Sequence, residues 1–220
     1  MATAMIMHEA GGPQVLRPET VTVGEPGPGQ VRLKQTAIGV NFHDIYVRSG
    51  LYQTLTLPGI PGLEAAGVVE AVGKDVTKWR VGDRVTVPFV GGCGTCQECN
   101  AGHHQVCDSQ FQPGFTHWGS FAEYVGIHYA DVNLVALPDT LAFDTAASLG
   151  CRFVTSFRAV VDQGRVSVGQ WVAVHGCGGV PTSSPTAAPL DTLRYPTAPA
   201  EAYQRIDGDS LLIKGASVID

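Results

Sequence analysis

Four closely spaced cysteines carry the clearest chemical signal in this sequence. Cys93, Cys96 and Cys99 follow one another at intervals of three residues, and Cys107 comes eight residues later. Thiolates at this spacing can surround one tetrahedral zinc ion, and four protein ligands leave no position for water or substrate. The sequence therefore predicts one structural zinc ion per chain, which would stabilise a lobe too small to form its own core.

Two other arrangements of these residues stay open. The four thiols could form disulfides or remain free, although clustered thiols in a reducing compartment favour a metal. His103 or His104 could replace one sulfur, because imidazole also binds zinc, although four cysteines suffice. The first residues lack the basic and long apolar segments of a signal peptide, which agrees with reduced cysteines and predicts a cytoplasmic protein.

A second motif, Gly176-Cys-Gly-Gly-Val180, is typical of a dinucleotide-binding turn. In Gly-x-Gly-x-x-Gly the glycines permit a tight turn and let the pyrophosphate approach a helix N-terminus. Gly176 and Gly178 fit this pattern and Gly179 lies beside them, but Pro181 takes the place of the third glycine. Residues 181–200 then hold five prolines, four threonines, four alanines and two serines, as an extended linker would. The three glycines are therefore interpreted as a remnant of a cofactor site.

The elements that must position these motifs are mostly strands up to about residue 135. Residues 31–40 alternate between apolar and polar, residues 63–72 form an apolar run, and residues 83–88 are rich in β-branched side chains. Apolar residues recur every three or four positions over 142–161, which predicts a helix interrupted near Gly150. Residues 171–175 predict a buried strand that leads into the glycine-rich turn.

Composition excludes several classes of protein. With 220 residues and 44% hydrophobic content the chain can bury a substantial core, so a globular protein is expected. The net charge of −6 gives no basic surface for nucleic acid or anionic lipid. No stretch approaches the ~18 apolar residues of a membrane span. We therefore expect neither a nucleic-acid partner nor a membrane partner.

Several long motifs in order resemble the medium-chain dehydrogenase/reductase superfamily over residues 1–180. The first ninety residues are similar to the quinone oxidoreductase branch, through Gly39-Val-Asn-Phe-His-Asp-Ile-Tyr46, Arg48-Ser-Gly-Leu-Tyr52, Gly62-Leu-Glu-Ala-Ala-Gly67 and Gly82-Asp-Arg-Val85. The next ninety are similar to the zinc alcohol dehydrogenase branch, through the four cysteines, Gly119-Ser-Phe-Ala-Glu-Tyr124, Ala147-Ser-Leu-Gly-Cys151 and residues 171–180. The resemblance implies a GroES-like β-barrel catalytic domain with a zinc lobe, followed in intact members by a Rossmann domain that binds NAD(P).

The predicted fold is therefore mainly β with short helices, a GroES-like β-barrel with a four-cysteine zinc lobe and no complete Rossmann domain. Residues 1–170 would form the catalytic domain, with the lobe at about 89–112, and residues 171–180 the remnant of the first Rossmann strand and its turn. After the linker at 181–200, residues 201–220 would form a helix and strand that return to the catalytic domain, as the last elements of intact members do. Excision of the cofactor domain explains this order, and a frameshifted or unselected tail is the alternative.

The resemblance also locates the ligands of a catalytic zinc. Zinc alcohol dehydrogenases hold that ion with a cysteine, a histidine and a second cysteine, and the matching positions here are Asn41, Leu63 and Cys151. Two of the three ligands are absent, while a catalytic zinc needs three protein ligands and one open position. The usual catalytic zinc is therefore not expected. The quinone reductase branch works without it and shapes its nicotinamide and substrate pocket with a motif like residues 41–52.

Six side chains are the candidates for such a pocket. They are Asn41, His43, Glu64 and Cys151 as catalytic candidates and Tyr46 and Tyr52 for contact with substrate. A sharper hypothesis lets His43, Glu64 and Cys151 converge on a metal, since imidazole, carboxylate and thiolate all bind zinc. The competing interpretation gives them ordinary structural roles, in which a histidine binds a carbonyl, a glutamate pairs with an arginine and a buried cysteine packs as a small hydrophobe. No spacing singles out the remaining histidines, His8, His117, His128 and His175.

Three functions are compatible with these observations. The resemblance implies hydride transfer between NAD(P)H and a small alcohol, carbonyl or quinone, although without a cofactor domain the chain alone would be redox-inactive. The alternative is a cofactor-free GroES-like module that keeps its structural zinc and binds small ligands or a partner. A defective product that exposes a former domain interface and aggregates is the third. The resemblance leaves a homo-oligomer open, and the sequence does not decide between NADH and NADPH.

Overall fold

The computed structural model of the protein describes residues 1–167, 172–175 and 211–214. The chain divides into two compact units, Met1–Cys151 and Arg152–Asp220. The first unit contains all the strands from β1 to β7, and the second contains β8 and β9. Among the described residues, no helix combines the length and the apolar character that a bilayer crossing requires.

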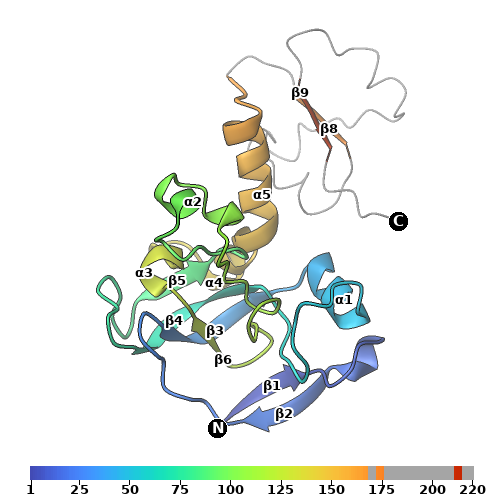
Figure 1. Ribbon diagram of the computed structural model, residues 1–220, viewed down its shortest axis with the longest axis vertical. Coiled ribbons are helices and arrows are strands. Elements are labelled where there is room, and N and C mark those ends of the chain that lie inside the picture. Colours follow the sequence, from blue (N-terminus) through green and yellow to red (C-terminus); the bar gives the residue numbers. More distant parts are fainter. Residues whose placement is uncertain (168–171, 176–210, 215–220) are drawn as a thin grey trace. The chain divides into compact units, whose positions relative to one another are not determined.

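A five-stranded antiparallel sheet organises the first unit, with the strand order β6-β3-β4-β5-β7 (Figure 1). Its strands are β3 (Val31–Gly39), β4 (Glu64–Val72), β5 (Arg84–Val87), β6 (Tyr124–Ile127) and β7 (Val135–Ala136). The strands predicted over 31–40, 63–72 and 83–88 are thus confirmed. The mainly β fold class is confirmed as well.

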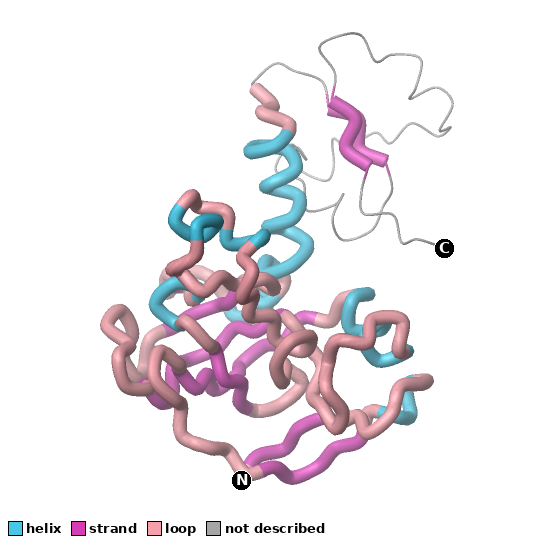
Figure 2. The backbone as a smooth tube through the Cα atoms, in the orientation of Figure 1, coloured by secondary structure: helices cyan, strands magenta, loops and turns pink. Residues whose placement is uncertain are grey.

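A separate two-stranded antiparallel sheet holds the N-terminus. It pairs β1 (Ala2–Ile6) with β2 (Arg17–Val21), and a single 3₁₀ turn, η1 (Pro13–Val15), lies between them (Figure 2). The segment before β6 joins this pair to the larger sheet, because Met5 N–H donates to the Phe121 carbonyl at 2.7 Å and Glu123 N–H donates to the Thr3 carbonyl at 3.0 Å.

The main core lies on one face of the five-stranded sheet. Alternation along β3 turns Val31 and Leu33 inward, where they meet Val69, Val85 and Phe111, and all five are 0% exposed. Burial of one such side chain stabilises the fold by about 1.5–3 kcal/mol. Phe111 precedes β6 and follows the cysteine lobe, so this core also anchors the lobe.

Five further short helical segments belong to the first unit. They are α1 (Phe42–Ser49), α2 (Gln97–Asn100), η2 (His104–Val106), α3 (Ala130–Asn133) and α4 (Phe143–Ala147). The longest, α1, begins where Asn41 N–H donates to the Asp44 carboxylate at 2.8 Å, and it ends at Gly50, whose φ of 83° only glycine adopts easily. This helix carries most of the predicted pocket motif.

The helix predicted over 142–161 is confirmed, with a change of hydrogen bonding at the predicted interruption. After α4 the chain forms a π-helical segment, η3 (Leu149–Phe153), then α5 (Val154–Phe157) and a second π-helical segment, η4 (Arg158–Gln163). At Gly150 the carbonyl accepts Phe89 N–H at 2.9 Å. A Cβ on this residue would lie 2.7 Å from the Val87 carbonyl oxygen, so glycine permits the close approach to β5.

The second unit contains a parallel pair of short strands. The strand predicted at 171–175 is confirmed as β8 (Val172–His175), which pairs with β9 (Leu211–Lys214) from Val172↔Leu211 to His175↔Lys214. The predicted glycine-rich turn and linker at 176–200 lie outside the described residues. The predicted C-terminal helix also lies outside them, as does the C-terminal strand apart from Lys214.

The β3–β4 pairing contains a glycine whose replacement tests the sheet. Gly67 is paired with Gln35, next to a register shift, and a Cβ there would overlap the Lys34 carbonyl oxygen. Because this oxygen belongs to the backbone, it can move away only if the strand itself shifts. We expect Gly67→Ala to lower the free energy of unfolding by about 1–3 kcal/mol in urea titrations.

The matched control is Gly126→Ala. Gly126 also lies in a strand of this sheet, β6, but a Cβ there would meet nothing within 4 Å. Its replacement should change the free energy of unfolding by less than about 0.5 kcal/mol. Equal unfolding midpoints for the two variants would contradict the close β3–β4 approach.

Candidate functional site

The cysteine lobe is a loop closed by backbone pairing at its neck. Gly91 N–H donates to the Phe111 carbonyl at 2.8 Å, and Phe111 N–H donates back to Gly91 at 3.0 Å. Between these residues the lobe contains only α2 and η2 (Figure 1). A lobe with so few elements cannot form a hydrophobic core of its own, which agrees with the predicted need for a metal.

The four cysteine sulfurs converge inside the lobe. All four Sγ atoms lie within 4.8 Å of one another, and those of Cys96 and Cys107 are 3.7 Å apart. A tetrahedral zinc with bonds of about 2.3 Å separates its sulfurs by about 3.8 Å, whereas a disulfide would bring them to about 2.05 Å. These four residues form no disulfide, so the disulfide alternative is wrong. Neither His103 nor His104 belongs to the converging group.

Backbone N–H groups already point at these sulfurs. Cys99 N–H donates to the Cys96 sulfur at 3.4 Å, and the N–H groups of Cys93 and Ser109 donate to the Cys107 sulfur at 3.3 Å each. Hydrogen bonds from Thr95 lower the pKa of Cys93 to about 6, whereas burial raises the pKa of Cys99 to about 12. A bound dication would favour the thiolate form of every ligand. The group can therefore hold a tetrahedral metal ion.

Asn133, which the sequence analysis missed, fixes the neck of the lobe. Its side chain is 3% exposed and pairs with both backbone groups of Gly92: Oδ1 accepts N–H at 2.9 Å and Nδ2 donates to the carbonyl at 3.0 Å. Nδ2 also donates to the His128 carbonyl at 3.0 Å. A Cβ on Gly91 would lie 2.6 Å from this amide, so that position requires glycine. No local sequence pattern connects Asn133 with a glycine forty-one residues earlier.

The candidate pocket is organised around Glu64 at the start of β4. Its side chain is 2% exposed, and both carboxylate oxygens accept hydrogen bonds of 2.7 Å. The donors are the side-chain amide of Asn41 and the backbone N–H of Cys151. A Cβ on Gly39 would overlap the carboxylate, so glycine leaves it room. The structure thus brings together three of the predicted residues, Asn41, Glu64 and Cys151.

A second buried carboxylate, Asp44, lies on the other side of Asn41. Asp44 is 4% exposed and accepts Asn41 N–H at 2.8 Å, while the side chain of Asn41 donates to Glu64. Burial raises the pKa of Asp44 to about 7; the nearby Glu64 charge also raises it, and backbone N–H groups of Asn41 and Gly62 oppose the shift. Asp44 is not among the site residues predicted from the sequence. The pattern Asn41-x-x-Asp44, typical of a helix start, could have indicated it.

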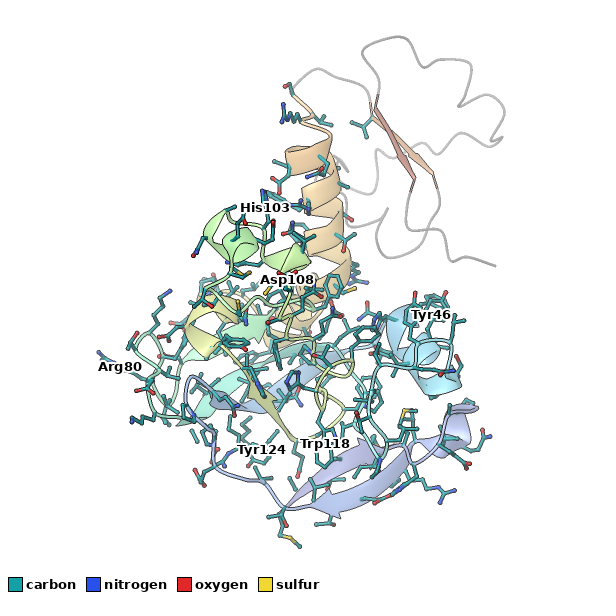
Figure 3. All side chains as sticks on the ribbon, in the orientation of Figure 1. Tyr46, Arg80, His103, Asp108, Trp118 and Tyr124 are labelled. Atoms are coloured by element: carbon teal, nitrogen blue, oxygen red, sulfur yellow. The ribbon has the colours of Figure 1, made fainter. Side chains whose placement is uncertain are left out.

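His43, Tyr46 and Tyr52 form an aromatic cluster on and beside α1. The His43 ring lies 5.3 Å from Tyr52 and 4.9 Å from Phe115, and Tyr46 meets Tyr52 edge to face at 5.4 Å. Figure 3 shows Tyr46 on α1. Burial lowers the pKa of His43, so its imidazole is neutral at neutral pH. Within the described residues, His43 Nδ1 and the Tyr46 hydroxyl are buried without a hydrogen-bond partner.

The hypothesis of a metal held by His43, Glu64 and Cys151 is wrong. In the part of the chain that the structure describes, the four lobe cysteines are the only group of three or more His, Cys, Asp or Glu side chains whose ligand atoms converge. Both oxygens of Glu64 already accept hydrogen bonds, and the His43 ring packs against Tyr52 and Phe115.

An open groove of about 640 Å³ lies elsewhere, between β1 and β3. Gln35, Ile38 and Phe121 are among its lining residues, and none of the six pocket candidates is. The groove therefore does not coincide with the pocket residues that the sequence predicts. Gly176, Gly178 and Gly179, the predicted cofactor remnant, lie outside the described residues.

Residues 27–139 match the family model of the alcohol dehydrogenase GroES-like domain. The chain belongs to this family. An alcohol dehydrogenase of Rhizobium meliloti is 39% identical over 181 residues, which are 81% of this chain and 52% of the relative. The chain thus spans about half the length of the curated relatives it matches.

Solved structures show the same fold. A cobalt- and zinc-bound thermostable alcohol dehydrogenase from Pyrobaculum aerophilum superposes with a TM-score of 0.76 at 31% identity, over 83% of this chain and 55% of the other. A quinone oxidoreductase of Pseudomonas syringae gives 0.66 at 34% identity, over 83% and 48%. The resemblance to both branches of the medium-chain dehydrogenase/reductases is therefore confirmed.

Asp44 makes stability depend on pH in a defined direction. Its pKa is about 7 in the folded chain and ordinary, near 3.8, when unfolded. Stability from the protonated carboxyl is therefore fully present below the unfolded pKa and is lost as pH rises through 7. Relative to Asp44→Asn, which cannot titrate, the wild type should lose about 2 kcal/mol of unfolding free energy between pH 5.5 and 8.

The measurement is urea unfolding of the metal-loaded chain across this pH range. The control is Asp75→Asn, which removes an exposed carboxylate in the same unit. This variant should follow the pH profile of the wild type. A wild-type profile parallel to that of Asp44→Asn would mean that Asp44 titrates normally.

Proposed function

We propose that this chain forms the substrate-binding part of an NAD(P)-linked oxidoreductase that acts on a small alcohol, carbonyl or quinone without a catalytic zinc. The observation that carries this proposal is the hydrogen-bonded group of Asn41, Glu64 and the Cys151 backbone. Two of its members, Asn41 and Cys151, stand at positions that match metal ligands of the zinc alcohol dehydrogenases, and Glu64 follows the third such position, Leu63. The medium-chain family supports the reaction class.

The residues at these positions do not fit a catalytic zinc. Leu63 is an apolar side chain that is 1% exposed, and Asn41 is neutral with its amide nitrogen donating to Glu64. Cys151 alone offers a preferred zinc ligand, whereas catalytic zinc needs three protein ligands and an open position. Polarisation of the substrate oxygen therefore falls to hydrogen-bond donors of the protein.

The aromatic cluster supplies such donors and an apolar wall. The buried Tyr46 hydroxyl can donate to a substrate oxygen, and the neutral His43 ring can bind through Nδ1, since neither atom has a partner within the described chain. Tyr52 and Phe115 flank His43 with ring faces that suit a flat apolar substrate such as a quinone. A bound nicotinamide would supply the hydride, while these residues bind and orient the acceptor.

The lobe cysteines have a different role in this proposal. Cys93, Cys96, Cys99 and Cys107 would hold one structural zinc ion per chain, because four thiolates close its coordination shell. This ion would hold the lobe in shape and take no part in the reaction. The same fold without any cofactor would be a zinc-stabilised binding module, which is the competing function.

We further propose that the 220-residue chain alone is redox-inactive. Pro181 replaces the third glycine of the nucleotide fingerprint, and the proline-rich run that follows does not favour the helix whose N-terminus binds pyrophosphate.

One preparation tests the zinc and nicotinamide proposals together. We expect one zinc per wild-type chain by elemental analysis, no zinc in Cys107→Ser, and full zinc in the control Cys151→Ser, whose backbone bond to Glu64 is kept. Titration with NADH and NADPH should leave nicotinamide fluorescence unchanged. Micromolar binding of either nucleotide would contradict the proposed inactivity, and zinc retained by Cys107→Ser would contradict the ligand set.

The pocket is tested with tetramethyl-1,4-benzoquinone, whose full substitution prevents addition of cysteine thiols. Tyr46→Phe removes one donor and keeps the ring, so we expect a two- to tenfold rise in the Kd measured by equilibrium dialysis, as for loss of one hydrogen bond of about 0.5–1.5 kcal/mol.

The control for the quinone experiment is Tyr124→Phe in β6, outside the aromatic cluster, with an unchanged Kd. Equal affinities of wild type and Tyr46→Phe would remove Tyr46 from the site. Lack of saturable binding by the wild type would contradict the pocket itself.

A further inference from the structure

Two histidines that have no role in the proposed function lie together at the neck of the cysteine lobe. The rings of His117 and His128 are 4.2 Å apart, and both lie against Phe111, at 5.1 Å and 5.0 Å. The His128 ring is stacked on Phe111 at an interplanar angle of 15°. Phe111 is 0% exposed, and its backbone closes the lobe on Gly91. The three rings therefore form one packed cluster under the lobe.

The hydrogen bonds around His128 favour its uncharged form. Nδ1 of His128 lies 3.4 Å from Nε2 of Gln30, and an amide nitrogen can only donate, so Nδ1 must accept. The other end of this amide is also engaged, because Gln30 Oε1 accepts Gly27 N–H at 3.1 Å. Protonation of Nδ1 would set two N–H groups against each other, and a flip of the amide would break the bond to Gly27. The site is built for neutral imidazole.

His117 adds a second constraint. Its Nδ1 lies 2.7 Å from the Thr116 hydroxyl, which can donate or accept, so this contact tolerates either charge state. The face of Phe111 could stabilise one imidazolium, but two at a ring separation of 4.2 Å repel each other. Burial lowers the pKa of both histidines, that of His128 to about 4 with His117 as the next cause.

The charged groups of the surrounding segments do not compensate this repulsion. In the described chain neither ring forms an ion pair with a carboxylate. On α3, Asp131 is bound by Thr77 and Lys78. In the segment that leads to Gln30, Glu25 pairs with Arg32. A proton taken up by the cluster therefore has no carboxylate counterion among the described residues.

The cluster is directly connected to the lobe. The His128 carbonyl and Gly92 share the side-chain amide of Asn133, and Phe111 pairs with Gly91. A shift of His128 would therefore disturb both links that close the neck. We propose that His117 and His128 form an acid-sensitive lock, in which the closed neck requires an uncharged His128 and protonation of that ring opens the neck and speeds loss of the lobe's metal. The metal-release part rests on the zinc proposed above, whereas the lock itself does not.

The first test of the lock is the titration of His128, in the wild type and then in one variant. NMR titration of the histidine ring signals in the folded chain, whether or not it holds zinc, should show His128 still neutral at pH 5.5. In His117→Gln the midpoint of His128 should rise, because its charged neighbour is gone. A wild-type His128 midpoint near the ordinary 6.5 would overturn the proposal, as would a His128 midpoint unaffected by His117→Gln.

The second measurement is zinc release to a chromogenic chelator at pH 7 and pH 5.5. His128→Phe keeps a ring on Phe111 but cannot take up a proton, and His128→Gln serves if that variant folds poorly. With a histidine that is neutral in the closed neck and ordinary in the open one, acid should speed release from the wild type about tenfold more than from either variant.

The control is His8→Gln, which removes an exposed histidine paired with Glu19 on the N-terminal strands and should release zinc as the wild type does. If acid speeds zinc release by the same factor in the wild type and in both His128 variants, the proposed lock is wrong. A chain that binds no zinc would contradict the proposed structural zinc alone, since the ring titration would still decide the lock.

Discussion

The buried carboxylate of Glu64 is the constraint on which the pocket side of this protein depends. Removal of a charge from water costs several kcal/mol unless strong hydrogen bonds offset it. Here two bonds of 2.7 Å do so, from the Asn41 amide and the Cys151 backbone. These donors come from the start of α1 and from the helical segment after α4, so one carboxylate joins β4 to both. Gly39 allows this because any side chain there would overlap the carboxylate.

The cysteine lobe depends on a different interaction, the hydrogen bonds of the neutral side-chain amide of Asn133. Asn133 replaces the backbone partners that Gly92 would have in a sheet, and Phe111 carries the connection into the main core. A lobe held this way could keep its position even if its interior depends on the proposed zinc ion. The two sites therefore share the five-stranded sheet and its core, yet different side chains organise them. Loss of metal would be expected to affect the lobe before it affects Glu64.

Local patterns predict much of this molecule. Alternation along residues 31–40 indicates β3, and the spacing of the four cysteines indicates their common ligand site, because both signals lie within a few residues. The partners of Glu64 and Asn133 are not predictable in this way, since their hydrogen bonds join residues up to eighty-seven positions apart. Helix α1 was missed because β-type motifs surround it and its start depends on the Asn41–Asp44 contact.

Two acid–base groups of the first unit, Asp44 and His128, respond to pH in opposite directions. Burial favours the neutral form of each group, which is the protonated form for Asp44 and the deprotonated form for His128. The pKa of Asp44 therefore rises from 3.8 to about 7 while that of His128 falls from 6.5 to about 4, and the two values cross. Between these values the folded chain keeps both groups neutral, while the unfolded chain ionises the aspartate and, below about 6.5, the histidine. Acidification thus strengthens the region around α1 and weakens the neck of the lobe. A global stability curve would partly hide both effects, so only variants of the individual residues separate them.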